Sequence, residues 1–162
     1  MMYAYAATGA RLNNNISLNN WWNPIGQALK SRLKSSKTIS ARVNSYIKKT
    51  NSRNTIYSKK ESISFSYSSK TTADLDLDYS VGNASNCTIK VERTNNRQWF
   101  TNKRKYNVTI TLSDLYDFAY FGKNEQNFIK RCINDYFGYY PQSYGILKKY
   151  NWKISFSYNV YK

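Results

Sequence analysis

The chain contains no histidine and only nine carboxylates among its 162 residues. Histidine is the commonest general base and the commonest metal ligand in proteins, so its absence removes both roles. Any catalysis must therefore depend on carboxylates, tyrosine, lysine, arginine, serine or threonine. Familiar nucleotide-binding and hydrolase motifs are also missing, including the P-loop, the dinucleotide-binding glycine fingerprint and the nucleophile elbow.

Cysteine and long apolar runs are scarce as well. Cys87 and Cys132 are too few for a disulfide framework or a zinc site, and we expect both to be small buried residues, with a single bridge as the alternative. No apolar run is long enough to span a bilayer, and the N-terminus lacks the profile of a secretory signal. Export would therefore need a larger carrier protein or a dedicated apparatus.

Positive charge is what the chain has in excess. The 25 lysines and arginines give a formal net charge of +16. This balance predicts a polyanionic partner, such as nucleic acid, an anionic membrane surface or a phosphorylated small molecule. The 17% aromatic content argues against disorder, and the length predicts one domain with its own core.

The N-terminal third predicts helices. Residues 1–20 are expected to be a leader or a loosely packed segment, and Asn23-Pro24 is expected to start a helix. Apolar positions then recur every four residues, at Ile25, Leu29 and Leu33 and again at Ile39, Val43 and Ile47. Residues 21–50 therefore predict two basic helices that pack on the core. Alternatively, the helices and Trp21-Trp22 lie on an anionic membrane.

From residue 59 onward the pattern alternates, which predicts strands. The alternating stretches are Ile63–Tyr67, Ala73–Val81, Cys87–Val91, Tyr106–Leu112 and Trp152–Val160. Residues 72–93 are expected to form a hairpin whose exposed acids, Asp74, Asp76 and Asp78, face solvent and basic neighbours such as Lys90, with calcium or magnesium binding as the alternative.

Helical spacing returns at residues 124–137, and Gly138 is expected to end that helix. The fold class is therefore α+β. We expect a curved, mostly antiparallel sheet of five or six strands within residues 59–162, N-terminal helices and one helix before the last strand. Residues 21–162 would form a single domain.

The segment Asp114-Leu115-Tyr116-Asp117 follows an alternating strand whose even positions are apolar. If the strand continues, Asp114 and Tyr116 share the inward face, where a carboxylate is costly unless paired or at the mouth of a cleft. If it stops at Ser113, these are turn residues. Two nearby acids can hold a divalent cation, so Asp114 and Asp117 are candidate Mg²⁺ ligands and Asp114, Tyr116 and Asp117 candidate catalytic residues.

Residues 94–105 are polar and basic apart from Trp99 and Phe100. The candidate phosphate-binding residues are Arg97, Lys103, Arg104 and Lys105, together with Lys123. An aromatic among these cations can stack on a base or touch lipid, whereas the simpler interpretation is a hairpin loop with a solvated tip. Phosphoryl or pyrophosphate chemistry is the reaction class that best suits acids and cations bordering one cleft.

A strand that runs into D-x-Y-D, as in Asp114–Asp117, resembles the active-site motif of the colicin M-type bacteriocins. This resemblance implies an α/β toxin with a curved sheet that uses magnesium to cleave the lipid-linked peptidoglycan precursor at its undecaprenyl-pyrophosphate bond. Asp114, Tyr116 and Asp117 would be the corresponding residues. The family has a basic pair that includes a histidine after the motif, where this chain has only Lys123, then Lys130 and Arg131.

The basic, Tyr- and Asn-rich composition also resembles the C-terminal toxin modules of polymorphic toxins. This resemblance implies secretion or delivery into a target cell and a cognate immunity protein. The hypothesis is thus a toxin domain that hydrolyses a lipid-linked pyrophosphate. The alternatives are a basic RNase or tRNase toxin and a non-enzymatic module that permeabilises membranes.

Overall fold

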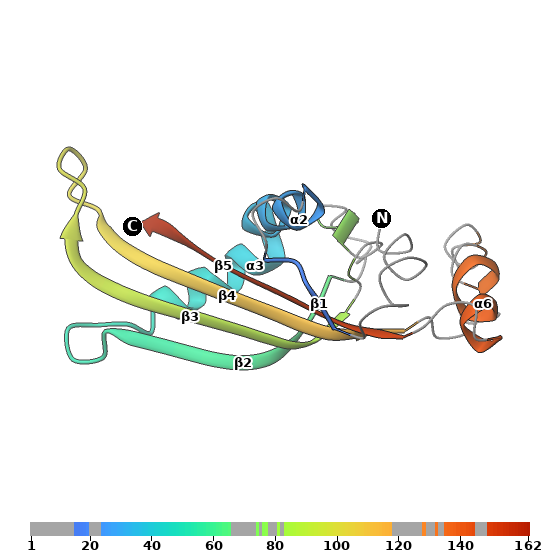
Figure 1. The fold of residues 1–162 in the computed structure, drawn as a ribbon. Coiled ribbons are helices and arrows are strands. Elements are labelled where there is room, and N and C mark those ends of the chain that lie inside the picture. The colour runs from blue at the N-terminus through green and yellow to red at the C-terminus, as the bar shows by residue number, and fades with distance from the viewer. Residues whose placement is uncertain are drawn as a thin grey trace. The chain divides into compact units, whose positions relative to one another are not determined.

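The computed structural model describes residues 15–19, 24–65, 74, 76, 77, 81, 83–117, 128, 132, 135–144 and 149–162 (Figure 1). The chain divides into two compact units. The first unit comprises Met1–Ser17 and Asp114–Lys153, and the second comprises Leu18–Ser113 and Ile154–Lys162.

The described elements confirm the α+β class. The helical elements are α2 (Pro24–Ser35), α3 (Lys37–Ile47), a π-helical turn, η2 (Asp135–Tyr139), and α6 (Tyr140–Ser143). The strands are β1 (Asn15–Ser17), β2 (Ile56–Ser64), β3 (Asn83–Arg97), β4 (Arg104–Tyr116) and β5 (Tyr150–Tyr161). As expected, helical turns precede the last strand.

The sheet has the order β1-β5-β4-β3-β2. β2 pairs with β3 and β3 with β4 in antiparallel register. Arg104 and Lys162 exchange backbone hydrogen bonds of 2.8 and 3.0 Å, which places β5 antiparallel to β4. The antiparallel part described here therefore has four strands rather than five or six, and the three-residue β1 adds to β5 in parallel.

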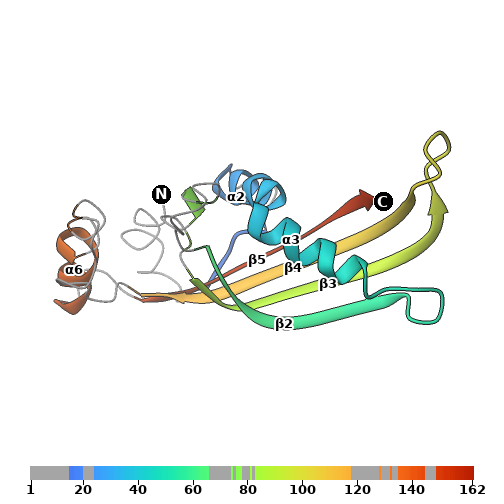
Figure 2. The same cartoon turned by 180° about the vertical axis from the view of Figure 1, so that it is seen from behind.

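The core of the second unit lies between one face of the sheet and the two N-terminal helices, which lie on the same side of the strands (Figures 1 and 2). The buried strand residues include Cys87, Ile89, Val91, Val108, Ile110, Leu112, Ile154 and Phe156. The helices also contribute buried residues to this core, namely Leu33, Ile39, Val43 and Ile47. This confirms the prediction that the apolar stripes of the helices face the core. Trp21 and Trp22 lie outside the described residues. Within residues 1–20, Leu18 is buried directly after β1.

The prediction that residues 72–93 form a hairpin is wrong. Asp74 and Val81 lie in turns, Asp76 and Leu77 are helical, and the Val81 N–H donates to the Leu77 carbonyl four residues back at 2.8 Å. Asp74, expected in solvent, is buried and accepts hydrogen bonds from Arg32 of α2 and from Ser36, the N-cap residue of α3. Asp78 lies outside the described residues.

The last helical segment also differs from expectation. Gly138 does not end a helix, because it lies inside η2 and α6 continues to Ser143. Pro141 lies in the first turn of α6. Of the remaining expected helix, residues 128 and 132 are described and are helical.

Both cysteines are free thiols in the structure. Cys87 is buried, as expected, whereas Cys132 is half-buried. Burial, with a smaller contribution from the Glu61 carboxylate, raises the pKa of the Cys87 thiol to about 11. A thiol with this pKa is unreactive at neutral pH. No helix among the described residues is long and apolar enough to cross a membrane.

Candidate functional site

The acidic motif lies at the end of β4. The strand runs on to Tyr116, so the alternative in which it stops at Ser113 is wrong. Asp114 is half-buried and Leu115 is exposed, which continues the alternation of the strand. One oxygen of Asp114, Oδ1, accepts the Leu115 N–H at 2.9 Å. The Tyr116 side chain lies outside what the structure describes.

Asp117 comes directly after β4, and its Oδ2 lies 2.6 Å from Lys149 Nζ. Lys149 was not among the expected site residues. It precedes β5, and the antiparallel register that pairs Arg104 with Lys162 brings Asp117 opposite Lys149. The basic residues before the last alternating stretch are the signal in the sequence, but they are informative only once the partner of that strand is known.

The donor set at this strand end fits a magnesium ion only in part. Mg²⁺ is commonly held by one or two carboxylates together with substrate phosphates and water, and Asp114 and Asp117 can provide the carboxylates. However, the Lys149 ammonium already binds Asp117. Among the residues that the structure describes, no three histidines, cysteines or acids gather into a metal-binding group.

The second candidate region is the hairpin between β3 and β4. The Gln98 N–H donates to the Lys103 carbonyl at 2.8 Å and closes a turn at the tip. Asn102 has a φ of 53°, a left-handed conformation that asparagine tolerates well, and its Oδ1 accepts a hydrogen bond from Arg97 Nη1 at 2.9 Å. The turn is thereby fixed by both backbone and side-chain bonds.

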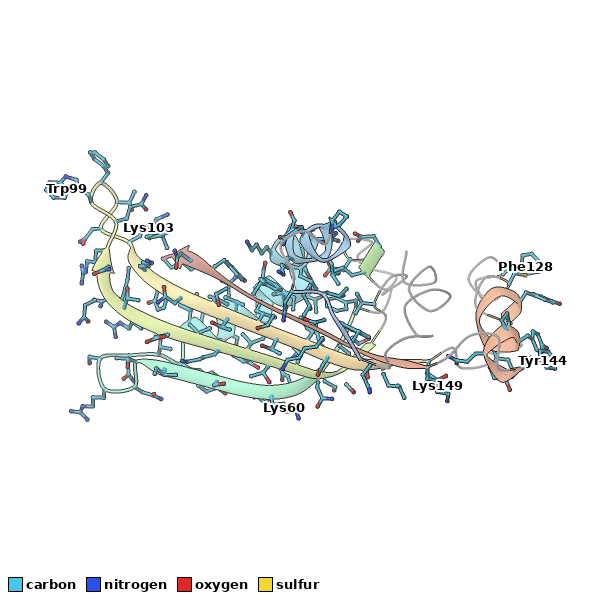
Figure 3. The ribbon with its side chains drawn as sticks, viewed as in Figure 1. Lys60, Trp99, Lys103, Phe128, Tyr144 and Lys149 are labelled. Atoms are coloured by element: carbon cyan, nitrogen blue, oxygen red, sulfur yellow. The ribbon has the colours of Figure 1, made fainter. Side chains whose placement is uncertain are left out.

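The two aromatic residues of this turn point away from the sheet. Trp99 is 91% exposed and Phe100 is 94% exposed. Figure 3 shows Trp99 projecting from the tip, with Lys103 behind it. The simpler interpretation of residues 94–105, a hairpin loop with a solvated tip, is thus confirmed, and the tip carries two exposed aromatic side chains.

The stem of the hairpin opposes two like charges. A register shift between Arg93 and Arg97 marks a bulge in β3, beyond which Arg97 lies directly opposite Arg104. Arg104 Nη1 donates to the Thr94 carbonyl at 3.3 Å, and Arg97 donates to the Asn102 side chain. Each guanidinium therefore has an uncharged acceptor. Like charges opposite each other destabilise a sheet, so this arrangement lowers stability unless an anion binds between them.

No described carboxylate pairs with the cations of the hairpin. We define the cationic hairpin as Arg97, Lys103, Arg104 and Lys105 with the turn they flank. None of these four residues takes part in an ion pair with another described residue. The nearest described acid along β3, Glu92, lies 3.9 Å from Lys90. Lys123 lies outside the described residues.

Other described acids of the second unit are matched by cations. Glu61 lies 2.7 Å from Arg42 and 3.0 Å from Lys59, and it accepts the Tyr46 hydroxyl at 2.6 Å. Burial opposes ionisation of Glu61, but these donors outweigh it and lower its pKa. Burial and the Glu61 carboxylate raise the pKa of Tyr46. The excess positive charge therefore remains at places such as the hairpin.

The hairpin and the acidic motif are separate candidate sites. From Arg104 to Ser113, β4 extends for about 30 Å at the usual rise per residue, and Asp114 is the next residue. Comparison with protein-family models, curated proteins and solved structures finds no match for this chain. The resemblance to colicin M-type bacteriocins therefore stays a prediction.

Proposed function

We propose that the chain binds phosphate groups of an anionic partner through the cationic hairpin. The observation that carries this proposal is the placement of Arg97 opposite Arg104 with no described carboxylate paired to either. A phosphate between the two guanidiniums relieves their repulsion, and arginine binds phosphate through two parallel hydrogen bonds. The formal net charge of +16 favours the approach of such a partner.

This proposal predicts that three hairpin cations contribute much of the affinity for anionic vesicles. The triple variant Arg97→Gln/Lys103→Gln/Lys105→Gln leaves Arg104 in place, because its guanidinium donates to a backbone carbonyl. Each cation near an anionic surface contributes about 1 kcal/mol, so we expect about 100-fold weaker binding to vesicles containing phosphatidylglycerol. Co-sedimentation over a lipid titration measures the change.

The matched control removes the same charge elsewhere. Lys37, Lys60 and Lys153 are exposed, and we expect their combined replacement by glutamine to weaken binding far less. An equal loss in both triple variants would show that net charge alone attracts the protein, and the hairpin would then not be a site. Circular dichroism establishes that both variants are folded.

For the acidic motif we propose a second function, hydrolysis of a lipid-linked pyrophosphate by a secreted or delivered toxin with an immunity partner. The continuation of β4 to Tyr116 and the ion pair between Asp117 and Lys149 support it. The Lys149 ammonium, beside Asp117, would bind a phosphate oxygen. Magnesium bound by Asp114 and Asp117 would stabilise charge on the phosphoryl oxygens.

The hydrolase proposal predicts that Asp114→Asn and Asp117→Asn each abolish pyrophosphate release and periplasmic toxicity. Both carboxylates are partly exposed, so the melting temperature should change little. Lys149→Gln should impair release and Lys149→Arg should preserve it. A folded Asp114→Asn/Asp117→Asn protein that still kills would contradict the proposal. Killing only from the cytoplasm, with degraded RNA, would favour the RNase alternative.

A further inference from the structure

We infer that the partner of the cationic hairpin is a lipid bilayer, into whose interface Trp99 and Phe100 insert. This inference rests on the proposed phosphate binding and identifies lipid headgroups as the source of the phosphates. Two adjacent large aromatic side chains, 91% and 94% exposed, contribute almost nothing to the core. Such side chains bury about 150–250 Å² each when they find a partner, so their contribution must come from binding.

The order of side chains along the hairpin matches the layers of a membrane interface. The aromatics lie within the turn that Gln98 and Lys103 close, and Arg97 and Arg104 pair directly behind it. At about 3.3 Å per residue, the guanidiniums follow the tip by roughly 5–10 Å, which is the depth to which apolar faces enter the headgroup region. The tip would thus reach the acyl boundary while the cations remain at the phosphates.

The turn is also preorganised for insertion. In addition to the bonds that close it, Thr101 Oγ1 donates to Gln98 Oε1 at 2.8 Å and Arg97 binds Asn102 at 2.9 Å. A fixed turn loses little conformational entropy when it binds. Tryptophan and basic residues together are also the typical anchors of proteins at membrane interfaces.

A single-stranded RNA fits this geometry less well. Proteins that bind single strands stack successive bases on aromatics along a groove or sheet face that also tracks the phosphates. Here the aromatics are on the outside of a tight turn. The outward positions of the central strands are polar, including Thr88, Lys90, Thr109 and Thr111, and Thr109 and Thr111 bond to Ser157 and Ser155 of β5 at 2.8 and 2.9 Å.

The experiment compares wild type with Trp99→Ala/Phe100→Ala on phosphatidylglycerol-containing vesicles. We expect about 30-fold weaker binding, equivalent to about 2 kcal/mol, and residual binding that is lost at high salt. Brominated lipids should quench a part of the wild-type tryptophan fluorescence that is absent from Trp99→Ala. Tyr144→Ala, which removes a 78% exposed aromatic of the first unit, is the matched control and should change neither readout.

The outcomes separate this inference from the proposed function. Vesicle binding that depends on the cations but not on Trp99 and Phe100 would overturn insertion and leave phosphate binding in place. Tight binding to a single-stranded RNA oligomer, with no binding to vesicles, would also overturn the bilayer as partner while keeping phosphate recognition. Failure to bind either ligand would contradict the proposed function itself.

Discussion

Replacing Asp74 by alanine should lower the free energy of unfolding at pH 7 by about 3–5 kcal/mol, the usual cost of removing one member of a buried, hydrogen-bonded charge pair. Oδ2 of this carboxylate accepts from Ser36 Oγ at 2.8 Å, Thr38 N at 2.9 Å and Thr38 Oγ1 at 2.7 Å. Oδ1 accepts from Arg32 Nη2 at 3.1 Å and from Lys37 N at 3.3 Å. Asp74 therefore compensates the positive end of α3.

The contribution of Asp74 should depend on pH. Burial raises the pKa of its carboxyl, but the hydrogen bonds from Thr38, Ser36 and Arg32 outweigh burial and hold the pKa at about 2. Because the folded pKa lies below the unfolded value, the stabilisation is complete above about pH 4 and is lost as the pH falls towards 2. The shift from 3.8 to about 2 corresponds to about 2 kcal/mol.

Urea unfolding of the wild type and Asp74→Ala at pH 7 and at pH 2.5 measures both effects. The difference between the two proteins should shrink by about 1–2 kcal/mol at the lower pH. Asp76→Ala is the matched control, since Asp76 binds the same Arg32 but is 59% exposed. It should cost less than about 1 kcal/mol. A loss of the same size in both variants would show that Arg32 is stabilised equally by either acid.

The Asp74 carboxylate also explains why the prediction of a strand at Ala73–Val81 is wrong. The central strands and both N-terminal helices could be predicted, because each has one apolar face that packs on a single partner. Leu77 and Val81 fit an alternating pattern, but their spacing of four residues also fits a helix. The helical outcome coincides with contacts from Asp74 to Arg32 and Ser36, more than 35 residues away, which local periodicity does not report.

In the candidate sites, too, the sequence predicts local features but not those that depend on strand pairing. The cations and aromatics of the hairpin were evident in the sequence, because a basic loop between two alternating stretches is a local feature. The opposition of Arg97 and Arg104 was not, since it depends on a bulge that shifts the register. Lys149 was missed because only the pairing of β4 with β5 brings it to Asp117, 32 residues away.

A glycine in α2 provides a second large effect, and its sign is opposite to the usual one. Alanine in place of a helical glycine normally stabilises by about 1 kcal/mol. A Cβ on Gly26 would instead overlap the carbonyl oxygen of Leu18, which is backbone and cannot rotate away. Overpacking of this kind typically costs about 1–3 kcal/mol, so Gly26→Ala should lower the free energy of unfolding by about 2 kcal/mol despite its better helix propensity.

The backbone at Leu18 has little freedom to move away from α2. The next residue, Asn19, makes two hydrogen bonds. Its side-chain Oδ1 accepts the Ser155 N–H of β5 at 2.6 Å, and the backbone carbonyl of Asn19 accepts from Lys30 Nζ at 3.0 Å. Ser31→Ala, at an exposed position of the same helix, is the control for propensity and should be neutral or slightly stabilising. If Gly26→Ala raised the unfolding midpoint in urea, the segment before α2 would be loosely packed after all, as its asparagine-rich sequence had indicated.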